Sequence, residues 1–173
     1  NQEYLDDIAY WIINKGPISR ANISKVLGLT KTTVSSIVAK LIEKKFVLEV
    51  GSDNTKLGRK PILLAFNANA GYVVSIEIGV DQIVALQSNL LGEKIKILEQ
   101  ETPNNNDGIR EALVEIIDSI NQEAKPSTYG LIGVTLGIHG VIHNDQISFA
   151  PYYDLSEFDL ANFLNQRFDT KVF

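Results

Sequence analysis

The spacing of apolar residues changes once along the chain, and this change limits the folds that the sequence can adopt. Before residue 46, apolar residues recur every three or four positions, which is typical of helices that bury one side. From residue 72 onward, short apolar runs alternate with turn-forming residues, as expected for strands. The pattern predicts an α/β protein with two domains, residues 1–67 and 68–173.

The first domain is expected to hold three helices. The first has an apolar stripe and ends at Gly16-Pro17. The stripe consists of Tyr4, Leu5, Ile8, Trp11 and Ile12. Ser19 has the side chain of an N-cap for a short second helix, and Gly28 can take the positive φ of a tight turn. Thr30 then caps a third helix with the apolar face Val34, Ile37, Val38, Leu41 and Ile42.

The outward side of the third helix carries no carboxylate before Glu43. It consists of Lys31, Thr32, Thr33, Ser35, Ser36 and Lys40. Because phosphates flank the major groove of DNA, a helix that enters the groove should exclude acids and present cations and small hydroxyls. The N-terminal residues of such a helix contact base edges, which places Lys31, Thr32, Thr33 and Ser36 nearest the bases.

A basic hairpin is expected behind these helices. Two strand-like runs, 46–50 and 61–66, flank a loop with two glycines and several turn-forming residues. Lys56, Arg59 and Lys60 cluster at or beside its tip, where they suit phosphate contact or minor-groove insertion. Residues 1–66 hold ten Lys/Arg and six Asp/Glu, a net charge of +4, whereas residues 67–173 carry a net charge of −9. The first domain is therefore predicted to be a winged helix-turn-helix that binds double-stranded DNA.

The residues expected to contact DNA extend beyond the third helix. Arg20 and Lys40 are expected to touch backbone phosphates, as are the cations of the hairpin. The complete predicted set is Arg20, Thr30, Lys31, Thr32, Thr33, Ser35, Ser36, Lys40, Lys56, Arg59 and Lys60. Winged helices also serve as protein–protein modules, so a protein-interaction domain without a nucleic-acid role stays open as an alternative.

The second domain is expected to form one open α/β layer. The strand-like runs are 72–78, 82–88, 93–100, 130–136, 141–142, 146–149 and 170–173. One predicted helix has an inner face of Ile109, Leu113, Ile116, Ile117 and Ile120. A second begins at a capping box, Ser156–Asp159, and has an inner face of Leu160, Phe163, Leu164 and Phe168. A tight turn is expected at Gly137–Gly140.

This order of parts resembles the ROK family of repressors and sugar kinases, over nearly the whole chain. The stretches that carry the resemblance are Ile18–Ala21 with Gly28–Ser35, Gly58–Leu64, Gly71–Val74 and Gly137–Val141. It implies that residues 68–173 are the first half of a sugar-binding domain with an actin-like, ribonuclease H-like ATPase fold, which we expect to continue beyond Phe173.

The resemblance also implies a function. We expect a homodimeric transcriptional repressor of a sugar-utilisation operon that leaves its operator DNA when a sugar effector binds. The similarity is greatest to xylose-operon repressors, so xylose or another monosaccharide is the expected effector. The family's Gly-x-Pro-Gly turn lies beside the sugar, which implies a ligand-binding role for Gly137, His139 and Gly140. His139 stands where the family has proline, so it either bonds a sugar hydroxyl or lies in a surface turn.

An alternative function is a sugar kinase with an appended regulatory head. ROK kinases carry an Asp-x-Gly-Gly-Thr loop for ATP phosphates, and the matching stretch here is Glu77–Asp81. Val80 replaces the second glycine and Asp81 replaces the threonine, so a branched side chain and a negative charge oppose phosphate binding. We therefore expect no enzymatic activity and no cofactor.

Metal and membrane sites are not expected either. The chain has no cysteine, and His139 with His143 lacks a third ligand. No apolar run reaches the ~20 residues of a membrane span, and the polar N-terminus is unlike a signal peptide. A cytoplasmic location is expected.

Overall fold

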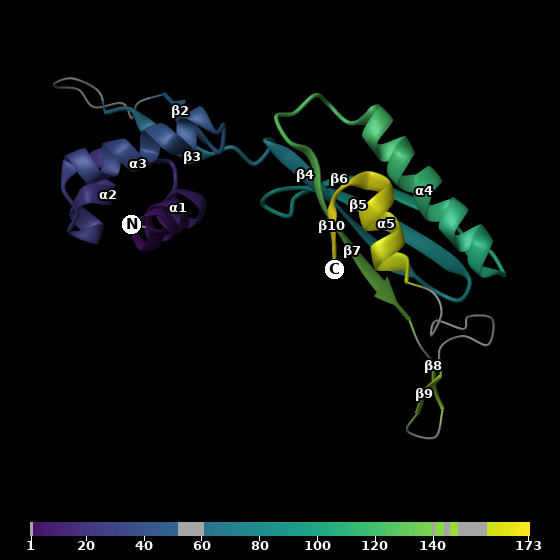
Figure 1. Cartoon of the computed structure of the whole chain (residues 1–173). Coiled ribbons are helices and arrows are strands. Elements are labelled where there is room, and N and C mark those ends of the chain that lie inside the picture. The colour runs from purple at the N-terminus through teal and green to yellow at the C-terminus, as the bar shows by residue number, and fades with distance from the viewer. Residues whose placement is uncertain (1, 52–60, 140, 144–145, 149–158) are drawn as a thin grey trace. The chain divides into compact units, whose positions relative to one another are not determined.

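The computed structural model of the chain describes residues 2–51, 61–139, 141–143, 146–148 and 159–173. It contains two compact units, Asn1–Ala68 (unit 1) and Asn69–Phe173 (unit 2). Each unit has its own hydrophobic core, and Figure 1 shows the helices and strands of each.

Unit 1 combines three helices with a small antiparallel sheet. Its elements are α1 (Gln2–Lys15), β1 (Ile18–Ser19), α2 (Arg20–Leu27), α3 (Lys31–Glu43), β2 (Val47–Val50) and β3 (Leu63–Phe66). The strands lie in the order β1-β3-β2, and the three predicted helices are confirmed. The two-residue strand β1 was not predicted from the sequence, because two residues are too few to show an alternating pattern.

The turns of unit 1 follow from its capping residues. The Ser19 hydroxyl accepts a hydrogen bond from the Asn22 amide at 3.1 Å, and Gly28 ends α2 with φ = 64°. The Thr30 hydroxyl accepts from the Thr33 amide at 3.1 Å and so begins α3. All three predicted roles are confirmed. Gly28 ends α2 and Thr30 begins α3, so only a short turn separates the two helices.

The core of unit 1 lies between the helices and the sheet. Ile8 and Ile12 of α1 pack with Val34 and Val38 of α3, all at most 1% exposed. Tyr4 was predicted to join this stripe, but its side chain is 39% exposed. That prediction was wrong because Tyr4 lies at the edge of a narrow stripe centred on Ile8 and Ile12.

Unit 2 is a mixed sheet with helices on one face. Its elements are β4 (Gly71–Ile78), β5 (Gln82–Asn89), β6 (Lys94–Glu101), α4 (Asn106–Glu123), β7 (Gly130–Ile138), β8 (Val141–His143), β9 (Gln146–Ser148), α5 (Leu160–Phe168) and β10 (Lys171–Val172). The main sheet has the order β10-β7-β4-β5-β6. Strands β4, β7 and β10 are parallel, whereas β5 and β6 are antiparallel to their neighbours.

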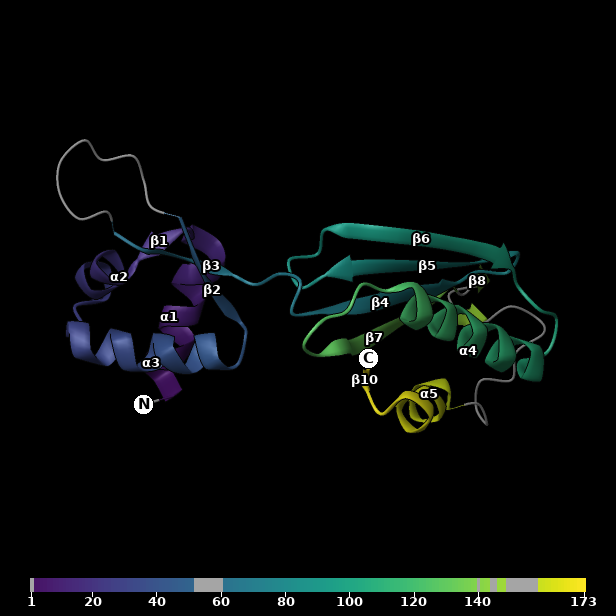
Figure 2. The ribbon, with the colours of Figure 1, turned by 90° about the horizontal axis from the view of Figure 1, so that it is seen from above.

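Helices α4 and α5 cover the same face of this sheet, because their buried residues share one core with β4, β5 and β7 (Figure 2). The predicted inner face of α4 is confirmed, since all five of its residues are at most 4% exposed. On the strands, alternate residues such as Val74 and Ile76 point into this core.

Two predictions for unit 2 are corrected by the structure. Gly137 and Ile138 do not form a turn but end strand β7, where they pair with Glu77 and Ile78 of β4. Parallel pairing continues to the end of β4, so the strand extends through the glycine. Helix α5 begins at Leu160 with Asp159 as its N-cap, later than the predicted capping box allowed. Gly140 and residues 156–158 lie outside the described residues.

No helix within the described ranges is both long enough and apolar enough to cross a membrane.

Candidate functional site

The outward side of α3 is the most distinctive surface of unit 1. Lys31, Thr32, Ser36 and Lys40 are exposed, and Thr33 is half-buried. The first turn of α3 contains no acidic residue. Neither Lys31 nor Lys40 makes an ion pair among the described residues, so both ammonium groups are available to an anion.

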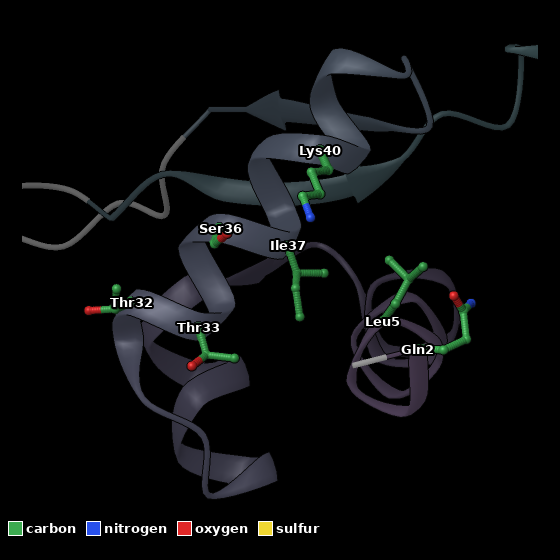
Figure 3. Close-up of a pocket in the computed structure, with 7 residues that line it drawn as sticks. All are labelled: Gln2, Leu5, Thr32, Thr33, Ser36, Ile37 and Lys40. Atoms are coloured by element: carbon green, nitrogen blue, oxygen red, sulfur yellow. The ribbon is translucent and has the colours of Figure 1, made fainter.

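This side of α3 borders a hollow of about 520 Å³ beside α1. Figure 3 shows Thr33, Ile37 and Lys40 along the side of α3 that faces α1. Leu5 and Ile37 give the hollow an apolar part, while hydroxyl and ammonium groups of α3 give it a polar part. The arrangement can contact both the apolar and the hydrogen-bonding groups of a base edge.

One predicted DNA contact already has a partner within the protein. The Thr33 and Thr30 hydroxyls lie 2.9 Å apart and share a hydrogen bond. Because Thr30 also accepts from the Thr33 amide, the pair stabilises the start of α3. Thr32, Ser35 and Ser36 make no side-chain hydrogen bond among the described residues, so their hydroxyls are more available than that of Thr33.

Arg20 lies at the start of α2 rather than on α3. Its guanidinium Nη2 is 2.7 Å from the Glu49 carboxylate Oε1 in β2. The predicted phosphate contact of Arg20 therefore competes with an internal carboxylate. Lys56, Arg59 and Lys60 lie outside the described residues.

A second group of candidate residues lies at the carboxyl ends of β4 and β7. The His139 Nε2 is 2.7 Å from the Glu77 carboxylate Oε2, and the His139 amide donates to the Ile78 carbonyl at 3.0 Å. A Cβ on Gly137 would lie 2.6 Å from both carboxylate oxygens of Glu77. Gly137 therefore makes room for the Glu77 side chain to reach His139.

Glu77 was not among the site residues predicted from the sequence. The signal that could have identified it is its place near the carboxyl end of a central parallel strand, where ligands of open α/β sheets bind. In the sequence, Glu77 stands out only as the first residue of the stretch that matches the family's phosphate loop. In the structure, the Glu77 carboxylate and the His139 imidazole are both exposed. The carboxylate can accept hydrogen bonds from hydroxyl groups, and the imidazole can donate or accept them.

The connection between β4 and β5 is a closed turn. The Gly79 amide donates to the Gln82 carbonyl at 2.8 Å, and the Thr102 hydroxyl donates to the Gly79 carbonyl at 2.8 Å. The one glycine amide of this stretch is thus already bonded within the turn, and Val80 is 41% exposed beside it. A phosphate needs several free amides in such a loop, so this turn is poorly suited to ATP.

No group of three or more His, Cys, Asp or Glu side chains in the described part of the chain is placed to hold a metal ion.

The sequence of unit 2 matches one family of proteins. Residues 73–173 match the model of the ROK family, and the chain belongs to this family. A crystal structure described as a ROK family transcriptional regulator, homolog of E. coli MLC protein, has the same fold. It superposes with a TM-score of 0.69 at 20% identity, over 99% of this chain and 45% of that chain.

The curated relatives extend the likeness into unit 1. The xylose repressor of Bacillus spizizenii is 35% identical over 164 residues, which are 94% of this chain and 43% of that protein. The DNA-binding transcriptional dual regulator NagC of Escherichia coli is 24% identical over 165 residues, 91% of this chain and 40% of that protein. The chain thus spans less than half the length of these relatives.

Proposed function

We propose that the protein is a sequence-specific transcriptional repressor and that unit 1 is its winged helix-turn-helix. The exposed, acid-free side of α3 carries this proposal. The short turn between α2 and α3 and the antiparallel strands after α3 support it, as do the names of the relatives. In such a motif the second helix lies in the major groove, which here is α3.

We propose that the repressor controls an operon for sugar utilisation and that xylose or another monosaccharide is its effector. The names of the xylose repressors support this choice. Unit 2 is proposed to be one half of an actin-like domain, and its mixed five-stranded sheet supports that assignment. Gly137, His139 and Glu77 would form one wall of the effector site. The residues of the β4–β5 turn favour this regulatory role over a kinase.

The proposed mechanism is a coupling between two binding events. A homodimer in the cytoplasm binds a roughly palindromic operator through two copies of unit 1. The sugar binds better to the state in which the two copies are wrongly spaced for the operator. A coupling of ~1–3 kcal/mol between sugar and DNA then suffices to release the repressor.

A salt titration of operator binding tests the role of α3. Each neutralised phosphate contact lowers the log–log salt slope by about 0.9. Lys31→Ala should therefore flatten the slope by roughly this amount, whereas Lys94→Ala, an exposed lysine of unit 2, should leave it unchanged. Equal slopes for the wild-type protein and Lys31→Ala would show that Lys31 does not contact a phosphate.

A second titration separates base contact from phosphate contact. Thr32→Ala should reduce the preference for the operator over unrelated duplex by about 1–3 kcal/mol while leaving the salt slope intact. The absence of any salt-sensitive affinity for duplex DNA would instead favour the protein-interaction alternative for unit 1.

A further inference from the structure

A second pocket, of about 420 Å³, lies at the edge of unit 2 opposite to His139. It is formed at the amino end of β4 and the carboxyl end of α4, and its lining includes Tyr72, Gln87 and Lys96. Strand β4 separates this edge from Glu77, since the step from Gly71 to Glu77 spans about 20 Å at 3.3 Å per residue. The pocket volume falls in the range of roughly 300–1,000 Å³ that small-molecule sites occupy.

Gln87 is the feature that points to a ligand. Its residue is only 4% exposed, it lines the pocket, and its carboxamide makes no hydrogen bond to any described residue. Because the carboxamide opens onto the pocket, water or a bound molecule can supply its hydrogen bonds. A molecule in the pocket that both donates and accepts hydrogen bonds would satisfy the carboxamide.

The charges around Gln87 are nearly balanced. Lys96 and Glu123 form an ion pair, which leaves Lys125 as the one further charged side chain of the lining. The carboxyl end of α4 at Glu123 carries a partial negative charge that offsets this lysine. This balance disfavours a strongly charged ligand. The ammonium groups of Lys96 and Lys125 and the carboxylate of Glu123 can instead form hydrogen bonds with a neutral ligand.

The remaining polar groups suit hydroxyls. The Tyr72 hydroxyl donates to the Asn121 Oδ1 at 2.6 Å and keeps its lone pairs as acceptors. The Ser127 hydroxyl accepts from the Gly130 amide at 3.0 Å and keeps its proton to donate. The exposed apolar side chain of Ile95 completes the lining.

We propose that this pocket binds a small neutral polyhydroxylated molecule of the monosaccharide class, at a site separate from the wall formed by Glu77, Gly137 and His139. Gln87 bonds two hydroxyl groups of the ligand, and the Lys96–Glu123 pair bonds others. The proposal does not depend on DNA binding by unit 1. Because Asn69 belongs to the lining, a bound sugar would also contact the first residue of unit 2.

Backbone-amide NMR on the full chain tests the proposal, with D-xylose and D-glucose as separate probes and sodium phosphate as the anionic probe. We expect the amide signals of Gln87 and Lys96 to shift with either sugar and not with phosphate. Gln87→Leu keeps the side-chain volume and should weaken binding about three- to tenfold. Gln82→Leu, at the exposed end of the same strand, is the matched control and should bind as the wild type does.

Lys125→Ala provides a variant whose folding is not in question, because Lys125 is exposed. It should weaken sugar binding, whereas His139→Ala should leave the shifts at Gln87 intact. Shifts confined to Glu77 and His139, or abolished by His139→Ala, would overturn the proposal. So would the absence of any shift at Gln87 under saturating sugar. An equal response to phosphate would show that the pocket binds anions and would refute the proposal of a neutral ligand.

Discussion

Arg20 at the start of α2 and Glu49 in β2 form an ion pair, with 2.7 Å between the guanidinium Nη2 and the carboxylate Oε1. Their side chains are 29% and 43% exposed, so solvent screens the pair and its contribution to stability is at most about 1 kcal/mol. In the proposed repressor the pair matters more for DNA binding, because Glu49 neutralises the guanidinium that we propose contacts a phosphate.

Replacing Glu49 by Gln should therefore strengthen binding to duplex DNA. The freed Arg20 gains a phosphate partner, which should tighten non-specific affinity by up to about fivefold and steepen the log–log salt slope by up to about 0.9. Glu99→Gln removes the same charge from an exposed position in unit 2 and serves as the control. If both variants tighten binding equally, the gain reflects net charge rather than Arg20.

Removing the Thr30 cap should destabilise unit 1. Thr30→Ala deletes the acceptor for the Thr33 amide and should lower the free energy of unfolding by about 0.5–2 kcal/mol. Urea unfolding followed by the fluorescence of Trp11, the single tryptophan of the chain, reports on unit 1 alone. Thr30→Ser retains the hydroxyl and should stay close to the wild type. An equal loss of unfolding free energy in Thr30→Ser would show that the methyl group of Thr30, rather than its hydroxyl, stabilises unit 1.

Two glycines of unit 2 should respond differently to alanine. At Gly71 a Cβ would lie 2.8 Å from the Gly130 backbone carbonyl oxygen, which cannot move freely, so Gly71→Ala should cost about 1–3 kcal/mol. At Gly137 the clash is with the mobile end of Glu77, so Gly137→Ala should cost less and instead separate Glu77 from His139.

Thermal unfolding by circular dichroism compares the stability of these two variants. The imidazole NMR signals of His139 report whether its contact with Glu77 is lost in Gly137→Ala. A larger destabilisation by Gly137→Ala than by Gly71→Ala would contradict the view that the Gly130 carbonyl is the less yielding neighbour.

Tyr72 should make unit 2 sensitive to alkaline pH. Burial raises the pKa of Tyr72 above its ordinary value of 10.0, because desolvation disfavours the phenolate. The folded state then holds the proton more tightly than the unfolded state. The stabilisation is complete below pH 10 and is lost as the pH rises through the pKa of the folded state.

Tyr72→Phe should remove this part of the alkaline dependence and also the hydrogen bond to Asn121, at a cost of about 0.5–1.5 kcal/mol near neutral pH. Urea unfolding at a series of pH values, followed by circular dichroism, measures both effects. Tyr10→Phe is the control, since Tyr10 is 58% exposed and lies in unit 1. An unchanged pH profile in Tyr72→Phe would refute the role of this phenol.

Much of each fold was predictable because the signals are local. The N-caps Ser19 and Thr30, the glycine after α2 and the inner face of α4 depend on residues within a few positions of one another. The same local pattern predicted which residues of α3 would face outward. The sequence did not reveal that the Thr33 hydroxyl is paired with Thr30, because side-chain partners depend on rotamers rather than on spacing.

Strand β1, the ion pair of Arg20 and the extension of β7 were missed for a different reason. Ile18 pairs with Leu64 and Arg20 with Glu49, and each contact joins residues far apart in the sequence. Gly137 looked like a turn residue, since glycine is frequent in turns and nothing nearby indicated Glu77. The amphipathic pattern of the chain alone thus determined which segments become helices or strands and left one side of α3 free of acid. Only tertiary packing decided which cation is already paired, which glycine makes room for a carboxylate, and that Gln87 lines a pocket, because these contacts form only after distant strands and helices meet.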